Sequence, residues 1–379
     1  MSSLAFFARR LTSGGIRSVR KISDGYRSLS CNRSTSPRTS AYESKTYGCC
    51  TVVTNTVRFR HITVAGFSAF ATIPANDPVV SADWLHDNIK DHHIKILDAS
   101  WYMPDDQRNP FQEFQTAHIP GSLFFDLDGI SDRTSNLPHM LPSEEGFSAA
   151  VSALGIDNKD GVIIYDGKGI YSAARVWWMF RVFGHNKVWV LDGGLPQWRA
   201  LGYDVESVSS GDAILKSSAA SDVVGNIYQG LSSDYPITFQ AKLQRHLVWN
   251  FDQIKQNMEE QSHQHLDARS KGRFDGTAAE PRKGLKSGHI PGSKCISFNE
   301  LLDSSNQTLL LARDISKRFY GGDIRLDGDV VISCGTGVTA CIVALGLHRL
   351  GKSDVKIYDG SWTEWASKPD TPIATTIQK

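Results

Sequence analysis

The chain has 379 residues, of which 40% are hydrophobic and 21% charged, which is ordinary for a globular protein and long enough for two domains. No apolar run approaches the roughly 18–20 residues that a membrane-spanning helix needs, so the sequence predicts no membrane partner. Residues 61–379 carry 30 basic and 38 acidic residues. This mildly acidic balance argues against nonspecific binding of nucleic acid.

Residues 1–75 differ in composition from the rest and are predicted to be a transit peptide and disordered leader. Residues 1–60 hold eleven Lys or Arg but only two acidic residues, Asp24 and Glu43. An Arg- and Ser-rich, acid-poor start is typical of organellar import signals, while Arg9 and Arg10 interrupt the apolar core that a secretory signal needs. A disordered basic tail is the alternative. Early Phe and Arg residues favour the mitochondrial matrix over the chloroplast.

Two copies of one unit follow in tandem. Four pairs of segments match in the same order at offsets of 167 to 171 residues: LDASW with LDARS, HIPG with HIPG, VIIYDGKG with VVISCGTG, and VWVLDGG with VKIYDGS. We therefore predict one domain over residues 78–205 and another over 236–372. The Ser- and Gly-rich segment 206–235 between them is predicted to be a linker.

Each copy has the pattern of an α/β domain. Short β-rich runs at 94–97, 162–165 and 188–191 alternate with helical stretches such as 172–183. This order predicts a mainly parallel sheet, in which ligands bind beyond the carboxyl ends of the strands. Five tryptophans are predicted to be packing residues: Trp177, Trp178, Trp198, Trp362 and Trp365.

The chain has six cysteines: Cys31, Cys49, Cys50, Cys295, Cys334 and Cys341. They show neither a CxxC pair nor the Cys/His spacing of a zinc site, so we predict no metal and no other cofactor. Six cysteines spread over so long a chain do not suggest a secreted disulfide scaffold. The sequence favours a reducing compartment in which at least one thiol is kept for reactivity.

Cys334 is the candidate nucleophile. It follows a strand-like run at 330–333 and precedes a short glycine-containing loop, after which an apolar helix begins near Val338. Backbone N–H groups converge where such a loop opens a helix, and a cysteine there typically has a pKa of roughly 3.5–7.5 in place of about 8.5. The alternative is a buried, inert cysteine, which is what we predict for Cys295 and Cys341.

The matching position in the first copy is Asp166, which cannot be a sulfur nucleophile. The first copy is therefore predicted to be inactive and the second catalytic. Two basic residues near Asp166, Lys168 and Arg175, are predicted to be ordinary surface charges.

The motifs of the second copy resemble those of the thiosulfate/3-mercaptopyruvate sulfurtransferases, which have two tandem rhodanese domains. The resemblance covers about residues 80–370 and depends on HIPG twice, SDRTS (131–135), GRFDGTAAEPRKG (272–284), CGTGVTA (334–340) and YDGSW (358–362). It implies two domains, each with a mainly parallel five-stranded sheet flanked by helices. Small neutral residues after the nucleophile, here Gly335-Thr336-Gly337, resemble the mercaptopyruvate branch, with Thr336 in place of a serine.

The resemblance also implies roles for particular residues. Arg273 and Arg282 would hold the carboxylate of the donor; without it, ion pairs with Asp275 and Glu280 would be the preferred interpretation. His118, in the first HIPG, is the candidate for a proton relay with Thr336. Its repeat mate, His289, occurs in the same motif, so both histidines are alternatively structural. The loop groups implied to bind substrate are Gly335, Gly337, Val338 and Thr339.

The predicted reaction moves sulfur from 3-mercaptopyruvate, or less readily thiosulfate, through a Cys334 persulfide to cyanide, a small thiol or thioredoxin. The chain is expected to act as a monomer. A dual-specificity phosphatase would need Arg at the sixth position after the cysteine, where this chain has Ala340. A non-catalytic persulfide carrier or redox sensor remains the alternative.

Overall fold

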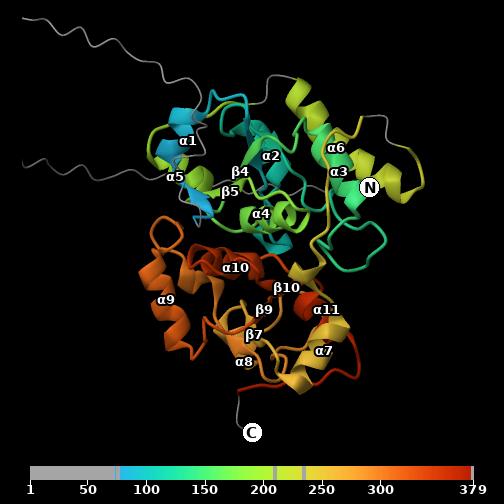
Figure 1. Cartoon of the computed structure of the whole chain (residues 1–379), viewed down its shortest axis with the longest axis vertical. Helices are drawn as coiled ribbons and strands as arrows, with labels where there is room; N and C mark the ends of the chain where they lie inside the picture. The colour runs from blue at the N-terminus through green and yellow to red at the C-terminus, as the bar shows by residue number, and fades with distance from the viewer. Residues whose placement is uncertain (1–72, 74–76, 208–210, 233–235, 377–379) are drawn as a thin grey trace, which may run out of the picture. The chain divides into compact units, whose positions relative to one another are not determined.

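The computed structural model describes residues 73, 77–207, 211–232 and 236–376. The predicted transit peptide and almost all of the leader lie outside the described residues. The remaining chain forms two sheets, coloured blue to green and yellow to red along the chain in Figure 1. The structure described below is therefore that of the two repeats.

The first repeat contains a five-stranded parallel sheet with the strand order β1-β5-β4-β2-β3. Its strands are β1 (Val79–Val80), β2 (Ile94–Asp98), β3 (Leu123–Phe124), β4 (Gly161–Tyr165) and β5 (Val188–Leu191). Its helices are α1 (Ala82–Asn88), α2 (Pro110–Thr116), α3 (Glu144–Ala153), α4 (Ala173–Val182) and α5 (Gly194–Ala200). Local signals start several helices: Ser81 and Asn109 accept hydrogen bonds from the first turns of α1 and α2.

The second repeat has the same topology, with the order β6-β10-β9-β7-β8 and only parallel pairs. Its strands are β6 (Val248–Trp249), β7 (Gln264–Asp267), β8 (Lys294–Cys295), β9 (Val330–Ser333) and β10 (Lys356–Tyr358). Its helices are α7 (Phe251–Glu260), α8 (Lys271–Asp275), α9 (Ala312–Gly321), α10 (Ala340–Arg349) and α11 (Ser361–Ser367). The predicted α/β class with two five-stranded parallel sheets is confirmed.

Apolar side chains cover both faces of each sheet, as a parallel sheet requires. One continuous cluster runs from the inner face of the first sheet through α4 and α10 to the second sheet. Figure 1 shows α4 and α10 next to each other. The outer faces pack separately, the first against α1 and α5 and the second against α7 and α11. All five tryptophans predicted to be packing residues are buried: Trp177, Trp178, Trp198, Trp362 and Trp365.

The segment predicted as a linker contains an eighteen-residue helix, α6 (Gly211–Tyr228). It packs against α3 and buries Ala220, Val223 and Val224. These residues recur at the three-to-four-residue spacing of one helix face, a signal that the many Ser and Gly residues of the segment obscure. Most of the expected linker is therefore a helix of the first repeat.

Candidate functional site

Cys334 lies directly after β9, at the carboxyl end of the strand, and α10 begins six residues later. Its backbone N–H donates to the Ser361 hydroxyl at 3.2 Å, and its carbonyl accepts from the Trp362 N–H at 3.0 Å. Both partners belong to α11. The strand-loop-helix predicted around Cys334 is thus present, and α11 fixes the backbone of the cysteine.

The loop after Cys334 presents unpaired backbone donors. Among the described residues, no protein group accepts from the backbone N–H groups of positions 335–339, and Thr339 does not cap α10 with its side chain. Gly337 has φ +76°, which glycine adopts without strain. A loop with unpaired amides at the start of a ten-residue helix is suited to bind an anion.

The first repeat shows what such a loop binds. There the Asp166 carboxylate accepts hydrogen bonds from the backbone N–H groups of Lys168, Tyr171 and Ala173 at 2.7 to 2.9 Å. The loop before α4 is therefore an anion cradle occupied by its own aspartate. The matching residue of the second repeat is Cys334, and a thiolate or persulfide there is suited to accept from the same kind of donors.

Cys334 is 1% exposed, whereas the glycines of its loop predict an open thiol. The difference arises because large side chains from both repeats gather around the sulfur. A Cβ atom on Gly335 would lie 3.1 Å from Nη2 of Arg273, and Tyr171 and Arg282 interact electrostatically with the cysteine. Burial raises the pKa of Tyr171 to about 12, and the nearby cysteine adds to this.

Arg273, in α8, belongs to a chain of ion pairs. Its Nη2 lies 2.6 Å from Oε2 of Glu280, while Oε1 of the same carboxylate lies 2.8 Å from Nη1 of Arg269. Arg269 is buried and also pairs with Asp267, so its positive charge is balanced by carboxylates within the protein. Arg273 remains 22% exposed. Glu280 therefore fixes the guanidinium of Arg273 at the edge of the site while leaving part of it accessible.

Arg282 is half-buried, and no ion pair of its guanidinium is found in the part of the chain that the structure describes. Burial lowers its pKa, as does the neighbouring charge of Arg273, whereas Cys334 and Asp128 act in the opposite direction. The structure thus brings Arg273 and Arg282 together near Cys334. Asp275, an alternative ion-pair partner from the sequence, pairs with Lys271 instead.

Thr336 is buried in the loop, and its hydroxyl makes no hydrogen bond to another described residue. Cys341, the second residue of α10, is buried as predicted, and its thiol donates to the Gly337 carbonyl at 3.1 Å. Burial raises the pKa of Cys341 above its ordinary value. Cys295 is half-buried rather than fully buried.

The structure does not bring His118 into contact with Cys334 or Thr336. Its Nδ1 lies 2.7 Å from the Phe114 carbonyl and its Nε2 lies 3.4 Å from Oε1 of Glu206. In the second repeat, His289 likewise contacts the carbonyl of a phenylalanine on which its ring stacks. Because the same arrangement occurs in both repeats, we favour the structural alternative for His118 and do not carry the relay with Thr336 forward.

Arg175 is a correction to the sequence analysis, which placed it on the surface. Its side chain, from α4 of the first repeat, is fully buried and lies 2.7 Å from Oδ1 of Asp359 in the second repeat. It also donates to the carbonyls of Gly337 and His139. A single arginine in the otherwise apolar run AARVWWMF was the signal that it has a buried partner.

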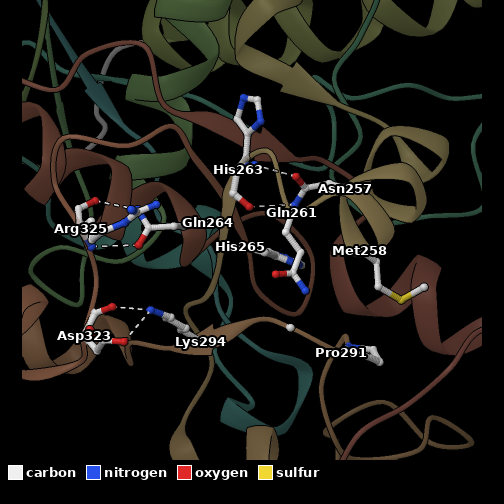
Figure 2. Close-up of a pocket in the computed structure, with 11 residues that line it drawn as sticks. Asn257, Met258, Gln261, His263, Gln264, His265, Pro291, Lys294, Asp323 and Arg325 are labelled. Atoms are coloured by element: carbon white, nitrogen blue, oxygen red, sulfur yellow. Dashed lines mark hydrogen bonds and ion pairs between the residues drawn. The ribbon is translucent and has the colours of Figure 1, made fainter.

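A separate pocket of about 270 Å³ lies at the other end of the second sheet, where β7 and β8 begin (Figure 2). Its polar side chains bind one another. Gln264 exchanges two hydrogen bonds with the backbone of Arg325, and Lys294 pairs with Asp323 at 3.1 Å. The lining contains neither Cys334 nor its arginines. This pocket is therefore not part of the candidate site.

Among the described residues, no helix is both long and apolar enough to cross a membrane. The same residues contain no group of three or more His, Cys, Asp or Glu placed to hold a metal ion.

Comparison with known proteins agrees with the repeat structure. The rhodanese-like domain family matches residues 81–201 and 250–368. The mitochondrial thiosulfate/3-mercaptopyruvate sulfurtransferase 1 of Arabidopsis thaliana is 69% identical over 311 residues, 82% of this chain and 81% of the relative. The human 3-mercaptopyruvate sulfurtransferase is 41% identical, covering 78% of this chain and 95% of the relative.

Among solved structures, the 3-mercaptopyruvate sulfurtransferase SseA of Escherichia coli superimposes with a TM-score of 0.62 at 33% identity. The superposition covers 76% of this chain and 99% of that structure. Together with the duplicated fold, these matches show that the chain belongs to the thiosulfate/3-mercaptopyruvate sulfurtransferase family of tandem rhodanese proteins.

Proposed function

We propose that this chain transfers sulfur from 3-mercaptopyruvate, and less efficiently from thiosulfate, to a thiol or cyanide through a persulfide on Cys334. One observation carries the proposal: the cysteine stands in a loop whose amides have no protein acceptor among the described residues, where the inert repeat holds a carboxylate. The names of the Arabidopsis and human relatives supply the substrate class.

In the first half-reaction, the Cys334 thiolate attacks the thiol sulfur of 3-mercaptopyruvate. An S–S bond forms and the C–S bond breaks, so the electron pair leaves on carbon as the enolate of pyruvate. The enolate takes the proton of the former thiol, and the products are pyruvate and the persulfide anion. No oxidant is needed. The amides of residues 335–339 are proposed to stabilise the anion before and after the transfer.

The donor's carboxylate is proposed to bind Arg273 and Arg282. The planar guanidinium can form paired hydrogen bonds with a carboxylate, which lysine cannot. Because Cys334 is 1% exposed, the donor must displace side chains that cover it. Arg273, partly exposed and close to Gly335, is the side chain that a carboxylate would draw aside.

In the second half-reaction, an acceptor attacks the outer sulfur and releases the Cys334 thiolate. Cyanide yields thiocyanate, and a small thiol or thioredoxin yields a persulfide of its own. The Cys334 persulfide is formed in the first half-reaction and consumed in the second, so ping-pong kinetics are expected.

The test compares kcat/KM for 3-mercaptopyruvate and thiosulfate with the purified protein, with cyanide as acceptor. We expect the higher value for 3-mercaptopyruvate, with release of pyruvate, and no detectable turnover for Cys334→Ser. A large excess for thiosulfate would contradict the donor assignment. Persulfide formation without turnover would favour a carrier, and full activity of Cys334→Ser would overturn the mechanism.

We also propose that residues 1–75 direct the protein to the mitochondrial matrix. The support is the acid-poor, Arg-rich composition of the first 60 residues and the mitochondrial Arabidopsis relative. Import of the full chain into isolated mitochondria with loss of the N-terminal segment would support this. Import into chloroplasts alone would contradict it.

A further inference from the structure

The first repeat contributes one buried cation to the loop that carries the nucleophile. We propose that Arg175 is a positioning residue: it holds the Gly337 carbonyl so that the neighbouring amides face Cys334. The inference rests on the proposed function, because it assumes that the amides of the loop stabilise the Cys334 thiolate and persulfide. It makes the inert repeat a working part of the active site of the other repeat.

Arg175 makes two hydrogen bonds and one ion pair, while its Nε has no hydrogen-bond partner among the described residues. Its Nη1 donates to the Gly337 carbonyl at 3.3 Å, and its Nη2 donates to the His139 carbonyl at 2.5 Å and pairs with Asp359 at 2.7 Å. The guanidinium also stacks over the ring of Trp178, 4.6 Å from its centre. Because Arg175 is fully buried and has these partners, its side chain is held in one conformation.

The Gly337 carbonyl is the point where this arginine meets the loop. It accepts from Arg175 on one side and from the Cys341 thiol on the other. Two donors therefore fix the position of this carbonyl and of the peptide group that joins Gly337 to Val338. The fit is close, because a Cβ atom on Gly337 would lie 2.8 Å from Nη1 of Arg175.

Asp359 completes the arrangement from the second repeat. Its Oδ1 pairs with Arg175, and its Oδ2 accepts from the Leu141 N–H at 3.0 Å. The pair therefore links α4, the segment around residue 140, β10 and the catalytic loop. Four titratable groups interact electrostatically with Cys334: Tyr171 and Arg175 from the first repeat, and Arg282 and Cys341 from the second. Arg273 and Asp359 lie beside Gly335 and Gly337 of its loop.

The test uses the full chain with Arg175→Lys and Asp359→Asn. Lysine keeps the charge but cannot span three partners, so kcat for 3-mercaptopyruvate should fall about tenfold, with KM changed less than about threefold. The second readout is the rate of Cys334 alkylation by iodoacetamide at a fixed neutral pH. It should fall in both variants by about threefold or more, because each variant loses a contact that holds the loop.

Arg181→Lys is the matched control. Arg181 lies on the same helix and also reaches the second repeat, with Nη1 2.6 Å from Nδ1 of His348, but it does not contact the loop. It should keep kcat within about twofold. Equal losses of kcat in Arg175→Lys and Arg181→Lys would overturn the inference, as would alkylation of Arg175→Lys at the wild-type rate.

Thermal unfolding of each variant separates loss of folding from loss of positioning. If Arg175→Lys does not fold, Asp359→Asn decides the question, and alkylation of that variant at the wild-type rate would overturn the proposal. A wild-type protein that transfers no sulfur would instead refute the proposed function itself.

Discussion

Glu280 lies between two arginines and determines which of them can meet a substrate. Its carboxylate is 2% exposed and pairs with Arg269 on one side and Arg273 on the other. Arg269 is fully buried, so of the two arginines that pair with Glu280 only Arg273 is accessible to the carboxylate of a donor. Replacing Arg273 leaves Glu280 paired with Arg269, and the fold should therefore tolerate the change.

Arg273→Gln should raise the KM for 3-mercaptopyruvate about tenfold or more, because hydrogen bonds to a charged carboxylate contribute about 1.5–3 kcal/mol. The change in kcat should be smaller, since the attacking sulfur is untouched. Steady-state kinetics with varied donor concentration measures both constants.

Lys271→Gln is the control for Arg273→Gln, because Lys271 lies in the same helix but is 64% exposed and pairs with Asp275. Its kinetic constants should stay within about twofold of wild type. If the donor KM of Arg273→Gln also stayed there, Arg273 would not bind the donor.

At the scale of single residues, the sequence identified as candidates the residues that belong to a recognisable motif. Cys334, its glycines and the two arginines lie near one another in the structure, and the roles assigned to them stay predictions. The sequence did not predict the ion pair of Arg175 with Asp359, because the two residues lie 184 positions apart in different repeats. The sequence also did not predict the burial of Cys334, because Tyr171 and Arg273, which lie near it, come from distant segments of the chain.

At the scale of elements, strands were easier to predict than helix α6. The expected runs 188–191 and 330–333 coincide with β5 and β9, because buried parallel strands are continuous apolar segments bounded by polar residues. In α6 the buried face is narrow and built from small residues. Its pattern is therefore weak against a background of serine and glycine.

If α6 is part of the first repeat, Val224→Ala should destabilise the protein by about 1–2 kcal/mol. Val224 is 0% exposed in the cluster that includes α3, so the substitution would leave a small cavity. The free energy of unfolding in urea measures the effect. A segment that were only a linker would show no such loss.

Leu215→Ala is the matched substitution on the same helix, where the side chain is 69% exposed. It should change the free energy of unfolding by no more than about 0.5 kcal/mol. Equal effects of Val224→Ala and Leu215→Ala would contradict the packing of α6 on α3.

At the scale of the whole described structure, the two repeats share one apolar cluster and several buried polar links. Arg349, at the end of α10, pairs with Asp77 and donates to the carbonyls of Leu309 and Leu310. Asp192 of the first repeat accepts from the Leu309 N–H at 2.7 Å. The first repeat is therefore built into the structure around the second, and separating them would expose apolar surface and unpaired charges together.

Acid should weaken this structure through its buried histidines, of which His265 gives the sharpest test. It is buried in β7 next to β9, with Nε2 2.8 Å from the Ser333 hydroxyl, and lines the pocket in Figure 2. Burial lowers its pKa from 6.5 to about 4. Between these values the unfolded chain binds a proton that the folded chain does not, so the stabilising contribution is complete above pH 6.5 and is lost as the pH falls towards 4.

His265→Asn should remove this dependence. The free energy of unfolding of wild type should fall by about 1.4 kcal/mol per pH unit more steeply than that of the variant between pH 6.5 and 4. Urea unfolding at pH 7, 6 and 5 measures the two slopes. His92→Asn, which changes a side chain that is 84% exposed, should leave the wild-type slope intact. Parallel curves for wild type and His265→Asn would mean that His265 takes up its proton without unfolding the chain around it.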